Sequence, residues 1–200
     1  MHSLRSSFIA SLCAATLLAC GGPPAPTPPT AAPAATDATP APTEAPASEP
    51  PATAPTPYTA DQIRDASKTG REWQYRVVAG DVTEWSVMTM TAVDADGATI
   101  VSSRRGGEGK ALGEPKEGKS TWEDLRQHAV FPASATTISD DTVKAPGGPY
   151  ASKKYTVKVD GGTSTYWFAN DLPGAPVKVT IEKGGAVVET RQLMKYNAGS

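Results

Sequence analysis

Apolar and polar residues alternate along much of the chain from residue 72 onward, with the period of two that is typical of β-strands. Segment 72–77 places three apolar side chains on one face and polar side chains on the other. Segment 82–93 carries apolar residues on both faces, and the turn Asp94–Gly97 leads from it into a further run over 98–103. The pattern predicts three strands, the last two joined as a hairpin.

The C-terminal part of the chain repeats this pattern between short turn segments. Its runs of eight to twelve residues are separated by glycine pairs or by a Pro-Gly step. Five strands are predicted there, over 135–145, 152–160, 163–170, 175–183 and 186–197. Strands joined by such short turns favour an antiparallel meander.

A short helix is predicted before the first strand. Thr59 is placed as its N-cap, and Gln62 stands three residues on, which is the spacing of a capping box. Ile63 and Ala66 would then face the core, and Gly70 would end the helix.

A second helix is predicted after a glycine-rich, charged loop over 104–119. Ser120–Leu125 reads as a capped helix start, and Trp122, Leu125 and Ala129 would lie on one face before Pro132 ends the helix. A strand is the alternative for this segment.

Together these elements predict a mainly β (α+β) fold in a single domain over residues 58–200. The domain would hold about eight antiparallel strands and one or two short helices. Its length of about 143 residues is enough to bury roughly two-thirds of the unfolded surface.

The N-terminal residues 1–19 form a different pattern, that of a secretory signal peptide. Arg5 provides a positive start, and residues 6–19 are uncharged and rich in apolar side chains. This run of about 14 residues is shorter than the roughly 20 that a membrane-spanning helix needs.

The signal ends in Leu17-Leu18-Ala19-Cys20, which resembles the lipobox of bacterial lipoproteins. The resemblance implies a diacylglyceryl group on Cys20, cleavage between Ala19 and Cys20, and acylation of the new amino group. Two or more acyl chains suffice for stable membrane anchoring, whereas one does not. The alternative is an ordinary secreted protein with a cysteine near the cut by chance. Because Cys13 would leave with the signal, no second thiol remains for a disulfide.

Residues 20–57 read as a disordered tether rich in Pro, Ala and Thr. Thirteen of the 37 residues from Gly21 to Pro57 are proline, and none is aromatic or a large aliphatic residue. Such a segment is a spacer reaching up to roughly 100 Å at about 3.1 Å per residue. Its alternatives are a proline-rich ligand for an envelope partner and a crossing of the cell wall. Because Gly21 is not acidic, the lipoprotein resemblance further implies an outer membrane location, facing the periplasm or the cell surface.

Two stretches near the C-terminus, Val143–Val157 and Thr165–Lys178, carry a second resemblance. They resemble small uncharacterised bacterial envelope proteins of the lipoprotein-carrier type, the LolA/LolB-like half-barrels. The resemblance covers roughly residues 135–196 and consists of turn and strand residues. It implies a curved antiparallel sheet that wraps an apolar cavity plugged by a helix.

The charge balance excludes several classes of partner. All basic residues except Arg5 and all but three acidic residues fall in 58–200, so the domain is neutral and no basic patch for nucleic acid stands out. Residues 113–120 match the P-loop expression, but Pro115 lacks an N–H and two glutamates would repel phosphate. No nucleotide, metal or other cofactor is therefore predicted.

Candidate site residues are few. His128 is the only histidine after the signal, so neither a zinc site nor a catalytic triad is predicted, and the catalytic list is empty. The four tryptophans, Trp73, Trp85, Trp122 and Trp167, would build the core or, on a concave face, line a ligand site.

The sequence thus favours a non-enzymatic envelope module, bound to the membrane through the acyl chains on Cys20. It would bind an apolar ligand or an envelope protein. The alternative is a structural or assembly partner without a ligand cavity, and a hydrolase comes third.

Overall fold

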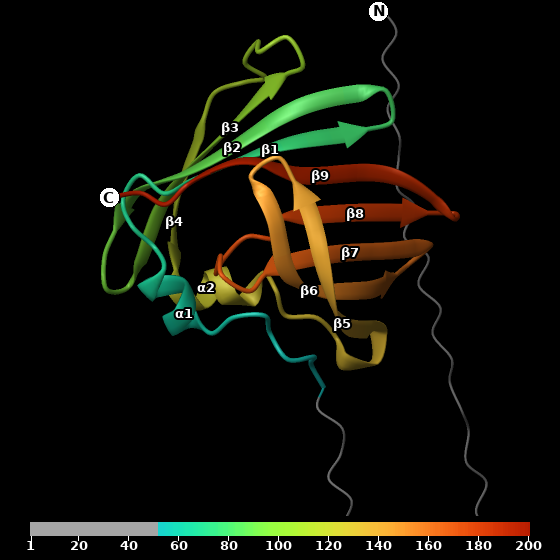
Figure 1. The fold of residues 1–200 in the computed structure, drawn as a ribbon. Coiled ribbons are helices and arrows are strands. Elements are labelled where there is room, and N and C mark those ends of the chain that lie inside the picture. The colour runs from blue at the N-terminus through green and yellow to red at the C-terminus, as the bar shows by residue number, and fades with distance from the viewer. Residues whose placement is uncertain (1–51) are drawn as a thin grey trace, which may run out of the picture. The chain divides into compact units, whose positions relative to one another are not determined.

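A computed structural model describes residues 52–200; the predicted signal peptide, Cys20 and most of the predicted tether lie outside the described residues. The described part contains one antiparallel sheet of nine strands, two short α-helices and one 3₁₀ turn (Figure 1). The elements are α1 (Ala60–Asp65), β1 (Glu72–Ala79), β2 (Val82–Val93), β3 (Gly97–Gly106), β4 (Lys116–Thr121), α2 (Trp122–Gln127), η1 (Ala133–Ala135), β5 (Thr136–Ala145), β6 (Gly148–Val159), β7 (Gly162–Ala169), β8 (Lys178–Lys183) and β9 (Ala186–Asn197). Within residues 52–200, neither helix is long and apolar enough to cross a bilayer.

The strand order across the sheet is β4-β3-β2-β1-β9-β8-β7-β6-β5. Two meanders, β1–β4 and β5–β9, are joined by the pairing of β1 with β9, which runs from Glu72↔Asn197 to Ala79↔Glu189. A register shift between Gln74 and Tyr75 interrupts this ladder, and such a bulge increases local twist. The result is a curved, open sheet with β4 and β5 at its edges (Figure 1). The predicted fold class is confirmed.

One face of the sheet, here called the inner face, carries Trp73, Met88, Tyr166 and Phe168. Directly paired residues share a face, which places Met88 beside Trp73 across β1 and β2. The side chain of Ile63 from α1 joins the same buried cluster, so the helices pack on this inner face.

The helix starts agree with the prediction. The Thr59 hydroxyl accepts from the Gln62 N–H at 3.1 Å, and the Gln62 side chain accepts from the Thr59 N–H at 2.8 Å. Thr121 and Asp124 form the same reciprocal capping box at α2. Both helices are shorter than predicted, because α1 ends at Asp65 and α2 at Gln127, well before the expected stops.

The predicted hairpin is confirmed, and its turn is held locally. The Asp94 carboxylate accepts from the N–H groups of Asp96 and Gly97, each at 2.9 Å. A Cβ atom on Gly97 would lie only 2.1 Å from the Ser120 carbonyl oxygen, so β4 approaches the turn more closely than any other residue allows.

The predicted loop over 104–119 is wrong at both ends. Strand β3 continues to Gly106, and β4 begins at Lys116, pairing with β3 from Ser102↔Lys116 to Gly97↔Thr121. The reason is that β4 is an exposed edge strand stabilised by backbone pairing, so it lacks the apolar alternation by which strands are recognised. It is the ninth strand, against about eight predicted.

Packing begins slightly before residue 58, inside the segment assigned to the tether. The Ala54 N–H donates to the Phe131 carbonyl at 2.9 Å, and Ala54 is buried. The Tyr155 hydroxyl donates to the Pro55 carbonyl at 3.0 Å. Residues 54–58, here called the strap, thus lie against β6 and lead into α1.

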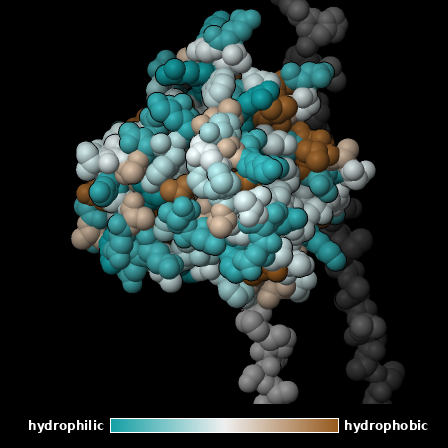
Figure 2. All heavy atoms as spheres, viewed as in Figure 1, coloured by the Kyte–Doolittle hydropathy of each residue, from teal (hydrophilic) through white to brown (hydrophobic). Residues whose placement is uncertain are grey.

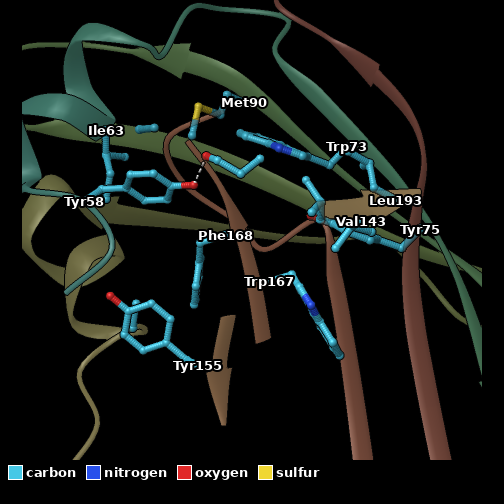
Figure 3. Packing of buried hydrophobic residues seen from close by; sticks show 14 of the residues in the cluster. Tyr58, Ile63, Trp73, Tyr75, Met90, Val143, Tyr155, Trp167, Phe168 and Leu193 are labelled. Carbon is cyan, nitrogen blue, oxygen red and sulfur yellow. Dashed lines mark hydrogen bonds between the residues drawn. The ribbon is translucent and has the colours of Figure 1, made fainter. Parts of the chain in front are cut away.

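Aromatic side chains form much of the core under the helices (Figure 3). Phe131 stacks on Tyr166 at 5.0 Å between ring centroids, and Tyr155 meets Phe168 edge-on at 5.4 Å. The Tyr58 hydroxyl donates to the Ala169 carbonyl, the dashed line in Figure 3. The strap, β6 and β7 are thereby tied together on the inner face.

Candidate ligand-binding cavity

A cavity of about 660 Å³ lies between the inner face of the sheet and the two helices. Most of its wall is apolar and comes from α1, α2, five strands and the β7–β8 loop. The apolar wall residues are Ile63, Trp73, Met88, Met90, Ile100, Leu125, Ala129, Tyr166, Phe168, Ala175, Pro176, Val179 and Ile181. Ligand pockets are typically apolar concavities of a few hundred Å³ or more, with few polar groups.

Strand periodicity positions the floor of the cavity. Met88 and Met90 both point inward from β2, and Tyr166 and Phe168 both point inward from β7. Methionine side chains are flexible and polarisable, so this floor can adapt to ligands of different shape.

The helices supply the opposite wall. Leu125 and Ala129 lie four residues apart and therefore on one side of α2 and its C-terminal extension. Ile63 is the buried residue of α1. Both helices are single capped segments of six residues, so their hold on the sheet depends on these few apolar contacts.

The polar residues of the cavity wall are few. Ser102 comes from β3, and Lys116, Glu117, Ser120 and His128 lie on the β4 and α2 side. On the β9 side Glu189 and Arg191 form an ion pair at 3.8 Å. The two acidic and two basic side chains among these residues balance, so the cavity carries no net charge from them.

The β7–β8 loop, residues 170–177, forms part of the cavity wall. Gly174, Ala175 and Pro176 line the cavity, and the Tyr75 hydroxyl donates to the Pro176 carbonyl at 3.0 Å. Burial raises the pKa of the Tyr75 hydroxyl well above its ordinary value, so this donor stays neutral and bound to the loop.

Of the four tryptophans predicted as ligand-lining candidates, Trp73 lies in the cavity wall and the other three lie elsewhere. Trp85 pairs with Arg76, on the face opposite Trp73. Trp167 points outward between two inward-facing neighbours. Trp122 is the first residue of α2, and its indole donates to the Ala95 carbonyl at 3.0 Å. The type of a residue does not show which face of the sheet it occupies, and for this reason the sequence did not separate Trp73 from the other three tryptophans.

The cavity-wall residues that sequence reasoning missed include Met88, Met90, Tyr166, Phe168 and Ile181. A usable signal existed, because alternation within β2 and β7 fixes which residues share a face once one of them is placed.

His128 is the C-cap residue of α2, at the cavity rim. The segment that matches the P-loop expression, residues 113–120, lies partly in β4. It is therefore partly an extended strand and not a loop leading into a helix. Among residues 52–200 there is no group of three His, Cys, Asp or Glu residues that could hold a metal ion.

Comparison with known proteins gives fold-level likeness. No protein-family model matches this chain, and no curated protein matches it. A Bacteroides fragilis protein named as exported, with a YmcC-like fold, superposes with a TM-score of 0.42 at 9% identity, covering 66% of this chain and 97% of that one.

Pseudomonas aeruginosa MucB, in a structure with MucA, gives a TM-score of 0.47 at 12% identity, covering 68% of this chain and 54% of that one. A structure of MucB without MucA gives 0.45 at 14% identity, covering 70% and 57%. This chain thus spans little more than half the length of the MucB chains. At these values the likeness carries no functional conclusion.

Proposed function

We propose that this protein is a lipid-anchored envelope protein whose inner cavity binds an apolar ligand of the acyl-chain type. The observation that supports the proposal is the cavity itself: about 660 Å³ with a largely apolar wall and a polar rim. A sheet whose inner face was filled by its own side chains would leave no room for a ligand. Here Met88, Met90 and Ile181 face open space that a chain-like molecule can fill.

An acyl chain suits this site on physical grounds. Each buried CH₂ group contributes about 0.8 kcal/mol of transfer free energy, and a chain can follow the curved inner face. The rim ion pair of Glu189 and Arg191 lies where the polar end of an amphiphile would leave the cavity.

Ligand binding is tested by exposing the purified full-length protein to a bacterial membrane extract, washing it, and analysing the organic extract by mass spectrometry. The variant Gly118→Trp places a large ring at the cavity mouth, where an added Cβ meets nothing within 4 Å. We expect at least a tenfold loss of co-purified lipid.

The matched control is Thr99→Trp, because Thr99 neighbours the inward-facing Ile100 on β3 and therefore faces the other way. It should retain lipid. Equal lipid retention by wild type and Gly118→Trp, or none by wild type, rejects the cavity as the site.

The anchor is proposed from the Leu17–Cys20 motif, and Cys20 is the only cysteine after the predicted signal. Mass spectrometry of the protein from its native membrane should find an acylated N-terminal Cys20. Cys20→Ser should move the protein out of the membrane fraction. An unmodified Cys20 thiol, or a protein that retains the signal peptide, contradicts the proposed anchor. Neither result bears on ligand binding in the cavity.

A second candidate function is assembly with an envelope protein, and exposed valines favour it. Val82 and Val187 are 55% and 57% exposed. The β1–β2 and β8–β9 hairpins that carry them are adjacent, since Ala79 pairs with both Val82 and Glu189. Figure 2 shows apolar surface at this end of the sheet. A photo-crosslinker at position 82 should capture a defined partner in cells if this function holds, and none if it does not.

A further inference from the structure

Arg71 is the one charged residue among the buried residues of the described chain, and its exposure is 0%. It lies between α1 and β1. No carboxylate of residues 52–200 lies within ion-pair distance of its guanidinium. Desolvation lowers the pKa of Arg71, as expected of a cation removed from water. Burial of such a charge is strongly unfavourable unless other groups compensate it.

The compensation comes from three separate segments. Nη1 donates to the Ser67 hydroxyl at 3.2 Å, just after α1, and Nε donates to the Tyr196 hydroxyl at 3.0 Å, on β9. Nη2 donates to the Pro173 carbonyl at 2.8 Å, in the β7–β8 loop. One planar side chain thus ties together segments more than 100 residues apart.

Two aromatic rings hold the guanidinium in place. Its central carbon lies 4.4 Å from the Trp73 ring centroid and 5.5 Å from that of Tyr196. Such contacts stabilise a desolvated cation, and the rigid fork of arginine reaches acceptors in fixed directions that lysine cannot reproduce.

This arrangement adjoins the cavity. Trp73 and Gly174 line the cavity, and both lie beside Arg71: a Cβ on Gly174 would be 3.6 Å from the Trp73 ring and 3.9 Å from Nη1. The loop that lines the cavity is therefore held at two carbonyls, Pro173 by Arg71 and Pro176 by Tyr75.

We propose that Arg71 is a positioning residue that fixes the β7–β8 loop as the end wall of the cavity and thereby limits the length of the chain that the cavity accepts. The ligand part of this proposal rests on the proposed function. Apolar residues of similar volume stabilise a core as well as a buried cation does. A fork aimed at three segments does what an apolar residue cannot, which is to specify where the loop lies.

The first test measures chain-length selectivity. Unbranched fatty acids from octanoic to stearic acid compete with the fluorescent probe 1-anilinonaphthalene-8-sulfonate for the full-length protein. We expect Arg71→Lys to bind the best wild-type chain about tenfold more weakly, while the preferred chain becomes longer. Tyr196→Phe, which removes one acceptor and keeps the cation, should shift the preference in the same direction and by less.

The matched control is Arg64→Lys, an exposed arginine of α1 whose ion pairs within residues 52–200 are with Asp61 and Asp65. It should leave the length profile unchanged. If the Arg71 and Tyr196 variants weaken all chains by the same factor, Arg71 only stabilises the fold and the proposal is overturned.

The second test needs no ligand. Amide hydrogen exchange is followed at Leu172 and Val177, whose N–H groups donate within and beside the loop at 3.2 and 2.8 Å. We expect roughly tenfold faster exchange there in Arg71→Lys and Tyr196→Phe, with core strand amides unchanged. Unchanged loop exchange rejects the positioning role. If the loop loosens while wild type binds no fatty acid, the proposed function fails and the positioning role stands.

Discussion

Three consecutive residues of β7 show how differently the two faces of the sheet are built. Tyr166 and Phe168 point inward, line the cavity and pack with other aromatic rings. Trp167 points to the opposite face, where it is also buried and where Lys154 and Lys178 lie over its ring at 5.6 and 4.9 Å. Both lysines are its direct register partners on β6 and β8.

The contrast extends to the indole donors. On the outer face the Trp167 Nε1–H donates to the Asp141 carboxylate at 2.9 Å. On the inner face the Trp73 Nε1–H is buried and has no acceptor among the described residues. The outer face satisfies its polar groups, whereas the inner face leaves both a donor and a volume unfilled. Unfilled apolar volume and an unpaired donor are costs to stability, and they mark the face where a ligand would contribute most.

The largest expected effect comes from the packed part of the inner face. Phe168→Ala should lower the free energy of unfolding by about 3–5 kcal/mol, because it removes a buried ring that Tyr58 and Tyr155 contact. Lys158→Ala, exposed on the outer face, should change it by less than about 0.5 kcal/mol. Urea titration of both variants measures the difference, and similar losses would contradict the contrast between the faces.

Alkaline pH should also act through the inner face. Burial raises the pKa of the Tyr58 and Tyr75 hydroxyls far above the value of about 10 in an unfolded chain. Their contribution is fully present below pH 10 and is lost as pH rises above it, because the unfolded chain gives up these protons first. The slope is about 1.4 kcal/mol per pH unit for each tyrosine. Denaturant titrations at successive pH values should show this fall, and Tyr75→Phe should remove one tyrosine's share; stability flat to pH 12 would contradict it.

A matched pair of substitutions compares the two indoles directly. Trp167→Phe loses the bond to Asp141, whereas Trp73→Phe removes a donor that has no acceptor. Both lose similar ring area and both rings contact cations. We therefore expect Trp167→Phe to destabilise by about 1–2 kcal/mol more than Trp73→Phe. Equal losses in thermal or urea unfolding would mean that the two faces satisfy their donors equally well.

The smallest expected effect lies on the solvent side of α2. Side-chain hydrogen bonds from Arg126 and then Gln127 lower the pKa of Glu123 from 4.5 to about 2. Its stabilising contribution is present above pH 4.5 and is lost as pH falls through 2. An NMR titration of the carboxyl group should show the low pKa, and Arg126→Ala should raise it. A Glu123 pKa near 4.5 in the wild-type protein would show that the ion pair with Arg126 does not stabilise the carboxylate.

Local rules explain the parts of the fold that the sequence predicted well. The β2–β3 hairpin and the α1 capping box depend on neighbouring residues, and each was found where expected. Strand β2, predicted over 82–93, has those bounds because its apolar run lies between two turns.

The parts that could not be predicted depend on tertiary context. Strand β4 is polar and exposed, so only its backbone pairing with β3 makes it a strand. Arg71 is charged, and a charged residue is expected at the surface. Its burial is possible because hydrogen-bond acceptors from distant segments surround it. Among the tryptophans, the period of two would have separated Trp167 from its inward-facing neighbours, but nothing local says which face is concave.

The pairing of β1 with β9 has a consequence for biogenesis. The first strand of the sheet finds its second neighbour only when the last strand has been made, so the two meanders cannot close into one sheet earlier. Contacts between residues so distant in sequence slow folding. The edge of β1 that pairs with β9 therefore stays open until residues 186–197 are available.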